Sequence, residues 1–457
     1  MQPDSCSSAL AEIAFSTPRN ISGEAFAAAK TCLIDYLASC LCAIPGDVAA
    51  TAEAVLPAYG AGRCGLAASS RTSSVHGSAF YHALIATAED LDDSHRYASG
   101  MHMSASTFPA ALALCEENPV SGRDFAAAIV AGYEVLGRIA RSVDIPLRKR
   151  GFHATGAVGP FGAAMTAAAL LKLSPAAIVD ALGIAASGCG GIFAFLREGS
   201  ASRHFHAGLA AGTGISAAFL ARAGMRGPRA ALEGGDGFFQ AYAGEWNEEI
   251  LLAPNDRPEI LAVYHKLWST CGHAIPAVSA LREIRKEIGN RLGQIRSIEI
   301  SGYKASAALD APWTDVAAKA RFSLPAITGI VLALGSAGVR EMSADNLRRP
   351  DVRRIAGLVS VREDPELSAA YPRLRSGRVR ILMDNGDRFE KLEEAPLGMP
   401  ENPASPAMLE DKFRIAAERH FSPARTDEIV ATVSKLDAVD DMREITRLLR
   451  REGNDSP

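Results

Sequence analysis

The hydrophobic pattern of residues 1–265 is helical almost throughout. Apolar positions recur at helical spacing in GEAFAAAKTCLIDYLASCLC, which follows Ser22 as a predicted N-cap. Similar stretches predict helices at about 79–91, 106–117, 122–142, 154–172, 175–187 and 206–223. Alanine and glycine fill many interior positions of these stretches, which predicts close contact between helices. We therefore expect an all-helical core in this half of the chain.

The pattern changes after about residue 265. The segment IRSIEISGY (295–303) alternates apolar and polar residues and predicts a half-buried strand. The segment RVRILMDNGDRFEKL (378–392) holds two strand-like runs around Asn385-Gly386, a strong hairpin signal. Helical patterns lie near 271–289, 323–335 and 343–349. This part is predicted to be α+β.

The last residues, from about Ala404, return to amphipathic helix. They either extend the α+β part or rejoin the helical core, and we favour the return because an insertion leaves both chain ends on one core. With 457 residues the chain also exceeds the size at which single cores stop growing. The predicted fold is mainly α, with an all-helical domain of residues 1–265 and 400–457 and a smaller α+β domain of residues 266–399.

The composition excludes several classes of protein. The net charge of −4 lacks the basic footprint of a nucleic-acid-binding protein. The eight cysteines form no paired C-x-x-C set, so they indicate neither a zinc site nor a disulfide framework and fit a reducing cytoplasm. No signal peptide is predicted, and the uncharged stretch 155–171 is interpreted as a buried helix. We expect a cytoplasmic protein with no nucleic-acid or membrane partner.

The stretch EDLDDSHRYASGMHMSASTFP (89–109) places acidic residues and histidines between two apolar segments. Isolated charges are costly to bury, so these side chains must reach solvent, pair with one another or line a polar pocket. The residues concerned are Asp92, Asp93, His95 and His102. A solvated helix end with aspartates near a cap fits the same pattern. We favour the pocket.

Another histidine lies in GFHATGAVGPFGAAM (151–165), where His153 occupies a glycine-flanked turn before a small-residue helix. A histidine in such a place is more often a turn residue than a catalyst, although a helix N-terminus also suits an anion. The G-x-x-G-x-x-G spacing follows no strand, so a dinucleotide site is only weakly indicated.

Cationic candidates follow in two further stretches. Arg203 and His206 lie three residues apart in LREGSASRHFHAGLAAG (196–212), which is either a surface turn at a helix start or a carboxylate clamp. The stretch YHKLWSTCGHAIPA (264–277) adds Lys266, Cys271 and His273. The sequence positions no Asn or Asp partner for a cysteine nucleophile, so Cys271 is interpreted as packing or lining a site.

Together these stretches resemble the MmgE/PrpD family, which includes 2-methylcitrate dehydratase, cis-aconitate decarboxylase and iminodisuccinate epimerase. The resemblance extends from the first helix to about residue 400. Its most specific pieces are LDDSH (91–95), GFHATGAVGPFGAA (151–164), SRHFHAGLAA (202–211), KLWSTCGHAIPA (266–277) and ARFSLP (320–325). The family's fold implies a large helical domain, an α+β lid and a site in the cleft between them. Relatives also suggest a homodimer.

The resemblance implies a role for individual positions. Catalytic roles fall on Asp93, His102, His153, Lys266 and Tyr303. Substrate-binding roles fall on Ser94, His95, Arg203, His206 and His273. From its own context, Tyr303 is most simply a strand-end aromatic residue. The scheme requires no cofactor and no metal.

The chain departs from the family pattern at several of these positions. Met103 and Ala154 stand where prolines are usual, and Pro276 stands where an Asp is expected. Arg203 replaces the usual lysine. Because arginine does not give up its proton, residue 203 can clamp a carboxylate but cannot act as a proton donor or base. The individual activity therefore stays open.

The common chemistry of the family is proton transfer at a carbon beside a carboxylate. A dehydratase then expels a β-hydroxyl, a decarboxylase loses carbon dioxide and reprotonates the carbanion, and an epimerase returns the proton on the other face. We predict a cofactor-independent lyase for a small polycarboxylate, first of the 2-methylcitrate dehydratase type. A cis-aconitate-type decarboxylase, an iminodisuccinate-type epimerase and a non-catalytic carboxylate-binding protein are the alternatives.

Each predicted residue has a physical task in this chemistry. The cations Arg203 and Lys266 hold carboxylates and stabilise developing negative charge, because preorganised positive groups act most strongly where water is excluded. His102 and His153 move the proton. Asp93 orients one of these histidines or acts as its partner.

Overall fold

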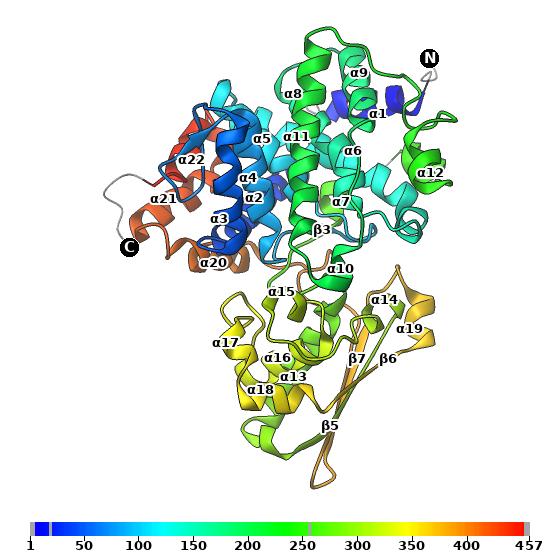
Figure 1. Ribbon diagram of the computed structural model, residues 1–457, viewed down its shortest axis with the longest axis vertical. Helices are drawn as coiled ribbons and strands as arrows, with labels where there is room; N and C mark the ends of the chain where they lie inside the picture. Colours follow the sequence, from blue (N-terminus) through cyan, green and yellow to red (C-terminus); the bar gives the residue numbers. More distant parts are fainter. Residues whose placement is uncertain (1–4, 18–20, 255–256, 452–457) are drawn as a thin grey trace. The chain divides into compact units, whose positions relative to one another are not determined.

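The structure is a computed structural model that describes residues 5–17, 21–254 and 257–451. Its contacts divide the chain into two compact units, whose elements are drawn in Figure 1. Unit 1 comprises Met1–Ala88, Asp92–Val263 and Ser405–Pro457, and unit 2 comprises Glu89–Leu91 and Tyr264–Ala404. The chain is mainly α, as the sequence predicted.

Unit 1 begins with helices of which α1 and α2 are capped by serine hydroxyls. They are α1 (Cys6–Ser16), α2 (Gly23–Cys42), α3 (Asp47–Val55) and α4 (Val75–Ala88). Ser22 caps α2 as predicted, its hydroxyl accepting the Ala25 N–H at 3.1 Å. By length and composition alone α2 could span a membrane, but 67% of its most apolar window is buried within the protein. A buried core helix accounts for that apolar character.

The central helices of unit 1 carry most of its candidate chemistry. They are α5 (Ser104–Glu117), α6 (Gly122–Lys149), α7 (Ala154–Ala157), α8 (Gly159–Leu170), α9 (Pro175–Ala186), α10 (Phe195–Glu198) and α11 (Ser202–Arg222). Their small residues allow the close packing that the sequence predicted. A Cβ on Gly214 of α11, for example, would lie 2.4 Å from the Cβ of Ala163 on α8.

Two of these helices differ from the sequence prediction. The single helix expected at 154–172 is divided at Val158 into α7 and α8. Pro160, in the first turn of α8, explains the break, because proline has no N–H to donate to the preceding turn. The helix expected from residue 206 begins at Ser202 instead, so Arg203 and His206 both lie in the first turns of α11.

The C-terminal helices pack onto the N-terminal ones inside unit 1. They are α20 (Pro406–Ala417), α21 (Pro423–Ser434) and α22 (Arg443–Leu448), and α12 (Glu248–Leu252) completes the α-helices of the unit. Lys412 of α20 forms a buried 2.6 Å ion pair with Asp35 of α2. His420 contacts the carbonyl of Leu41 through Nε2 at 3.0 Å. These contacts attach the end of the chain to its first core helix.

The short strands β1 (Cys64–Gly65), β2 (Thr72–Ser73), β3 (Ser94–His95) and β4 (Val263–Tyr264) precede the main sheet. That sheet lies in unit 2 and has the order β6-β5-β7-β8. Its strands are β5 (Ile295–Gly302), β6 (Val359–Glu363), β7 (Gly377–Met383) and β8 (Arg388–Glu393). Strand β5 pairs parallel with β6 and antiparallel with β7. The predicted hairpin is β7–β8, and Gly386 at its turn has φ 92°.

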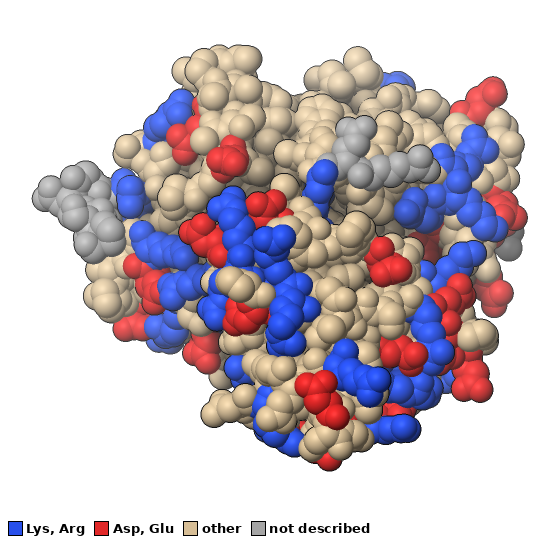
Figure 2. Space-filling view, turned by 60° about the horizontal axis from the view of Figure 1, so that its bottom comes forward, with Lys and Arg blue, Asp and Glu red and all other residues tan. Residues whose placement is uncertain are grey.

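Helices complete unit 2. They are α13 (Ile275–Ile288), α14 (Lys304–Ala307), α15 (Ala317–Ala320), α16 (Leu324–Leu334), α17 (Ala344–Leu347), α18 (Pro350–Ala356) and α19 (Pro365–Ala370). Apolar residues of α13 and α16 form one buried core with alternate residues of the sheet, among them Ile298, Ile300, Val379 and Ile381. On the face shown in Figure 2, basic and acidic side chains are interspersed, in keeping with the small net charge of −4.

Candidate functional site

The D-D-S-H segment between α4 and α5 is buried along its length, with Asp92 and Asp93 both 0% exposed. The carboxylate of Asp93 accepts the Ser104 N–H, at the start of α5, at 2.8 Å. It also accepts the Tyr133 hydroxyl of α6 at 2.8 Å. The partial positive charge of a helix N-terminus stabilises a carboxylate in this position. Asp93 thereby links α5 to α6.

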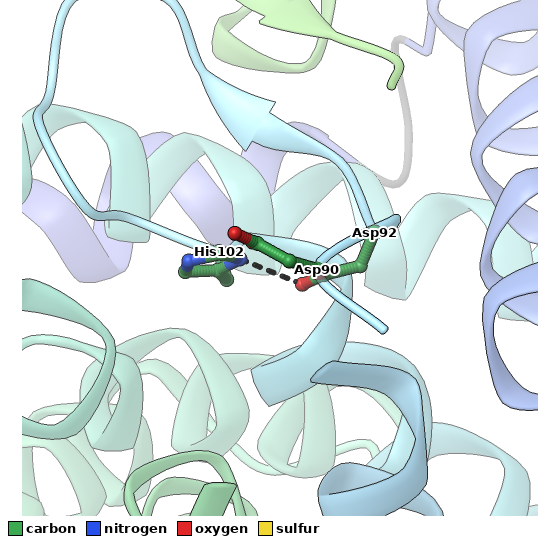
Figure 3. A group of neighbouring side chains, drawn as sticks. All are labelled: Asp90, Asp92 and His102. Atoms are coloured by element: carbon green, nitrogen blue, oxygen red, sulfur yellow. Dashed lines mark hydrogen bonds and ion pairs between the residues drawn. The ribbon is translucent and has the colours of Figure 1, made fainter. Parts of the chain in front are cut away.

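His102 is held by the neighbouring aspartate. Its Nδ1 lies 2.8 Å from Oδ2 of Asp92, and Figure 3 draws this contact as a dashed line. A carboxylate at Nδ1 favours the tautomer in which Nδ1 carries the proton and Nε2 keeps a lone pair.

The backbone around His102 is positioned by a threonine. The N–H of His102 donates to Oγ1 of Thr155 at 3.1 Å, and that hydroxyl donates to the carbonyl of Gly100 at 2.9 Å. Gly100 has φ +70°, and a Cβ there would lie 3.2 Å from Cζ of Phe193 and 3.4 Å from Cδ2 of His153. The position therefore suits glycine for both its backbone conformation and its close neighbours.

His102, His153 and His206 form a cluster that we call the histidine cluster. The rings of His102 and His153 lie 5.9 Å apart, and the Nδ1 atoms of His153 and His206 are 2.9 Å apart. The rings of Phe193 and Phe195 lie 4.9 Å and 5.3 Å from that of His153. The loop before α5, the N-cap of α7 and the first turns of α11 thus bring their histidines together within unit 1.

Burial keeps two of these histidines uncharged. It lowers the pKa of His153 well below the ordinary value of 6.5, and the positive charges of neighbouring histidines and arginines act in the same direction. Burial also lowers the pKa of His206, with a further contribution from Arg203. In a neutral pair, one imidazole donates an N–H to the lone pair of the other, which the short distance between the two Nδ1 atoms requires.

Arg203 supplies a permanent positive charge beside this pair. Its Nη2 donates to the carbonyl of Thr87, in the last turn of α4, at 2.6 Å. The Thr87 hydroxyl contacts Nδ1 of His204 at 2.9 Å. A cation at a helix C-terminus is stabilised by the unsatisfied carbonyls there. Thr87 therefore fixes the start of α11 against the end of α4.

His95 belongs to a different buried network. Its Nε2 lies 2.8 Å from Glu259, which also forms a 2.6 Å ion pair with Arg141. Its Nδ1 accepts the Tyr97 N–H at 3.2 Å, so Nε2 carries the proton and donates to Glu259. Ser94, the preceding residue, is 3% exposed. The substrate-binding roles expected for Ser94 and His95 stay predictions.

In unit 2, Lys266 forms a buried ion pair with Asp90 at 2.6 Å. The exposed fraction of the Lys266 side chain is 1%. Arg321 pairs with Glu89, and the hydroxyl of Ser269 donates to the Glu89 carbonyl at 2.5 Å. These contacts explain why Glu89–Leu91 belongs to unit 2 rather than to the helical unit that surrounds it in sequence.

His273 and Tyr303 lie together in unit 2. The Tyr303 hydroxyl and Nδ1 of His273 are 2.7 Å apart, and the ring of Tyr303 stacks on Tyr371 at 4.5 Å. Burial raises the pKa of Tyr303 well above its ordinary value, against the opposing effect of Arg375. The phenol is therefore neutral and shares a hydrogen bond with the histidine.

Known proteins place this chain in a family. The model of the MmgE/PrpD N-terminal domain matches residues 9–250, and that of the MmgE/PrpD C-terminal domain matches residues 268–437. The chain belongs to the MmgE/PrpD family.

Several relatives of this MmgE/PrpD protein are named cis-aconitate decarboxylase. Cis-aconitate decarboxylase of Mus musculus is 27% identical over 387 residues, which cover 81% of this chain and 78% of the relative. The enzyme of that name from Aspergillus terreus is 27% identical over 79% of this chain and 78% of the relative. Cis-aconitate decarboxylase-like protein oryM of Aspergillus oryzae is 24% identical over 95% of both. These relatives support a lyase-type enzyme of the MmgE/PrpD family.

The structure adds residues that the sequence did not single out for a catalytic role. Asp92, rather than Asp93, is the carboxylate found at His102. Thr155 and Gly100 shape the loop that carries His102. The sequence pattern cannot tell which of the adjacent residues Asp92 and Asp93 contacts a histidine. The contact between Thr155 and His102 joins residues that are 53 apart in sequence. No local signal could have identified these roles.

Asp92 and His102 also offer donor types that bind transition metals, a carboxylate oxygen and an imidazole nitrogen. In the structure these two donors face each other across a hydrogen bond (Figure 3). The pair therefore has the geometry of an acid–base unit, and acid–base chemistry explains it without further groups.

Proposed function

We propose that this MmgE/PrpD protein is a decarboxylase for a small unsaturated polycarboxylate such as cis-aconitate. The single observation that carries the proposal is the histidine cluster, in which an aspartate orients one histidine beside a neutral histidine pair. The relatives named cis-aconitate decarboxylases support this activity over the 2-methylcitrate dehydration that we predicted first.

His102 is the proton-transfer residue in this proposal. Decarboxylation breaks the bond between a carbon and its carboxylate, carbon dioxide leaves, and the electron pair stays on the substrate. Protonated His102 then donates a proton from Nε2 to that carbanion, while a hydrogen bond from Nδ1 to Asp92 fixes the orientation of the ring. The neutral imidazole is afterwards reprotonated from water.

His153, His206 and Arg203 bind and polarise the substrate in the same scheme. A neutral histidine pair whose Nδ1 atoms share one hydrogen bond keeps one Nε2–H to offer to a carboxylate, and it does not compete for the proton that His102 delivers. Arg203 adds a charge that cannot be lost, and a fixed cation stabilises the carboxylate and the negative charge that develops beside it. This division of tasks matches the departure of residue 203 from lysine.

The remaining family positions are carried over as proposals. Asp93 supports the loop through α5 and α6, and Lys266, His273 and Tyr303 supply carboxylate-binding or proton-donating groups from unit 2. Action of these residues on the substrate that His102 protonates stays a prediction, as do a homodimeric state and a cytoplasmic location.

The test is a substrate panel of cis-aconitate, citrate, 2-methylcitrate and amino-dicarboxylates, incubated in deuterated water and followed by proton NMR and by carbon dioxide release. We expect carbon dioxide from cis-aconitate, with one deuterium in the product. His102→Gln should abolish this turnover without unfolding the protein. His76→Gln is the control, because His76 contacts Ser216 at 2.9 Å and lies outside the histidine cluster.

The panel also separates the alternatives. Loss of water from citrate or 2-methylcitrate without carbon dioxide release would establish the dehydratase, and deuterium exchange into an amino-dicarboxylate would indicate the epimerase. Binding of these acids without any turnover would identify a non-catalytic carboxylate-binding protein. Any of these three results would refute the decarboxylase.

A further inference from the structure

Arg375 is a buried cation of unit 2 that forms no ion pair with a carboxylate among the described residues. It lies in the loop between α19 and β7, and 2% of its surface is exposed. Within residues 5–17, 21–254 and 257–451, no carboxylate forms an ion pair with it and its Nε has no hydrogen-bond partner. Arginine keeps its charge in proteins, and a buried charge without an opposite partner is costly. A negatively charged ligand would remove that cost.

The ring of Tyr264 lies beside the guanidinium, and Tyr303 and Tyr371 interact with its charge. Its central carbon lies 5.1 Å from the ring centroid of Tyr264. Tyr303, stacked on Tyr371, is also close enough for the charge of Arg375 to oppose the rise in its pKa that burial causes. A ring face attracts a cation more weakly than a carboxylate does. These tyrosines hold the guanidinium in place and leave its charge available to a ligand.

A second unused donor lies next to Arg375 in sequence. Ser376 is 1% exposed, and its hydroxyl has no hydrogen-bond partner among the described residues. The next residue, Gly377, packs against the start of α13, where a Cβ would lie 2.9 Å from Cβ of Pro276. No side chain caps that helix N-terminus, which adds positive potential beside the loop. Consecutive residues thus present unsatisfied donors in a positive, water-poor environment.

We infer that Arg375 and Ser376 form a carboxylate-binding subsite in unit 2. The Nε–H and one terminal N–H of the guanidinium match the two oxygens of a carboxylate, and the serine hydroxyl donates to one of them. The inference rests on the proposed function, because a polycarboxylate substrate needs several cationic contacts. It adds a substrate-binding residue that none of the motifs in the sequence identified.

The experiment measures binding of tricarballylate, a saturated tricarboxylate, to the full chain by calorimetry. We expect Arg375→Met to weaken binding at least about thirtyfold, as loss of charge-assisted hydrogen bonds does. Arg375→Lys keeps the charge but loses the paired donors, and it should weaken binding about tenfold. Arg353→Met is the matched control, because Arg353 is exposed and lies 4.6 Å from the ring of Trp313.

Several results would overturn the subsite. They are no binding of tricarballylate to the wild-type protein, or an affinity within twofold of wild type for a folded Arg375→Met or Arg375→Lys variant. If neither variant folds, the test is the hydrogen-exchange rate of the segment that contains Arg375 and Ser376, measured in the wild-type protein with and without tricarballylate. Protection by tricarballylate supports the subsite, and unchanged exchange refutes it.

His102→Gln separates the subsite from the proposed reaction. This variant should bind tricarballylate like wild type while it releases no carbon dioxide from cis-aconitate. If the wild-type protein releases none either, but binding still depends on Arg375, the decarboxylase fails and the subsite stands. If turnover is present and binding ignores Arg375, the subsite fails and the decarboxylase stands.

Discussion

The histidine cluster of unit 1 and the Arg375 loop of unit 2 both bury ionisable groups, with opposite consequences. In unit 1, burial lowers the pKa of His153 and His206, so these side chains lose their charge. In unit 2, the charge of Arg375 persists although no carboxylate in the described part of the chain forms an ion pair with it. Neutral imidazoles can donate and accept hydrogen bonds, whereas a permanent cation can only hold an anion. The histidine cluster is therefore suited to the reacting end of a carboxylate substrate, and the Arg375 loop is suited to binding a carboxylate.

The largest expected effect concerns the buried ion pair of unit 2. Lys266→Met leaves the carboxylate of Asp90 buried without its cation, which should cost about 3–5 kcal/mol of unfolding free energy. Urea denaturation measures this loss. Replacing both partners, as Lys266→Met with Asp90→Asn, should restore most of it, because no charge then stays buried and asparagine tolerates the positive φ of 52° at residue 90.

An exposed pair provides the control for that prediction. Lys286 contacts Glu283 at 2.8 Å, and its side chain is 68% exposed. Lys286→Met should therefore change stability by no more than about 1 kcal/mol. Equal losses for Lys266→Met and Lys286→Met would mean that burial of the charge does not decide the energetics of unit 2.

The next effect distinguishes the adjacent aspartates of unit 1. Asp92→Asn removes the acceptor that fixes the His102 tautomer, and it should lower kcat about hundredfold, within the range of general acid–base contributions. Asp93→Asn disturbs contacts to Ser104 and Tyr133, so it should mainly lower thermal stability. Steady-state kinetics and melting temperatures of both variants test this. If Asp93→Asn lowers kcat more than Asp92→Asn does, Asp93 is the partner of the catalytic histidine, as the sequence predicted.

The neutral histidines predict a dependence of stability on pH. The folded-state pKa of His153 lies below the ordinary value of 6.5, so below pH 6.5 the unfolded chain binds a proton that the folded chain does not. Stability is complete above pH 6.5 and falls as the pH drops toward the folded-state pKa, by up to about 1.4 kcal/mol per pH unit for each such proton.

The contribution of His153 is isolated with His153→Gln. Between pH 7.5 and 5.5 the wild-type protein should lose more unfolding free energy than this variant, because glutamine takes up no proton in the unfolded chain. Other buried histidines, such as His82 with its pKa lowered to about 4, titrate in both proteins and cancel in the difference. An identical slope for the two proteins would show that His153 binds its proton equally well in the folded and the unfolded chain.

The smallest effect is expected in the loop that carries His102. Gly100→Ala should cost about 1–2 kcal/mol for the positive φ, and its new Cβ presses on Phe193 and His153. Gly60→Ala is a matched control, because Gly60 has φ +85° and nothing lies within 4 Å of its Cβ position. Both variants should lose stability, and only Gly100→Ala should lower kcat. Equal kcat values for these variants would show that the contact with His153 is irrelevant to turnover.

Much of the fold was predictable because its signals are local. The capping hydroxyl of Ser22, the Asn385-Gly386 turn and the alternation in β5 each depend on neighbouring residues, and each appears where the sequence indicated. The sequence predicted one helix over residues 154–172, because its apolar run continues through Pro160, whereas the structure divides this segment into α7 and α8. Ends of helices were the least predictable feature, as α11 shows by its start at Ser202.

The candidate site was predictable by residue type but not by pairing. The motifs pointed to His102, His153 and His206, which the structure does bring together within unit 1. They could not say that Asp92 serves His102, or that His95 is bound to Glu259, which is 164 residues away in sequence. Such contacts depend on how the helices pack against one another, and the periodicity of apolar residues along the chain does not predict this packing.

By itself, the sequence determined which segments are helix or strand and which residue types are available for proton transfer and carboxylate binding. Both follow from short-range physics, namely the spacing of apolar positions and the chemistry of side chains. Only the tertiary structure decided which groups stay charged, because that depends on how far packing removes them from water. Arg375 shows this most clearly: in the sequence it is one arginine among many, and burial without a carboxylate makes it a candidate for binding a ligand.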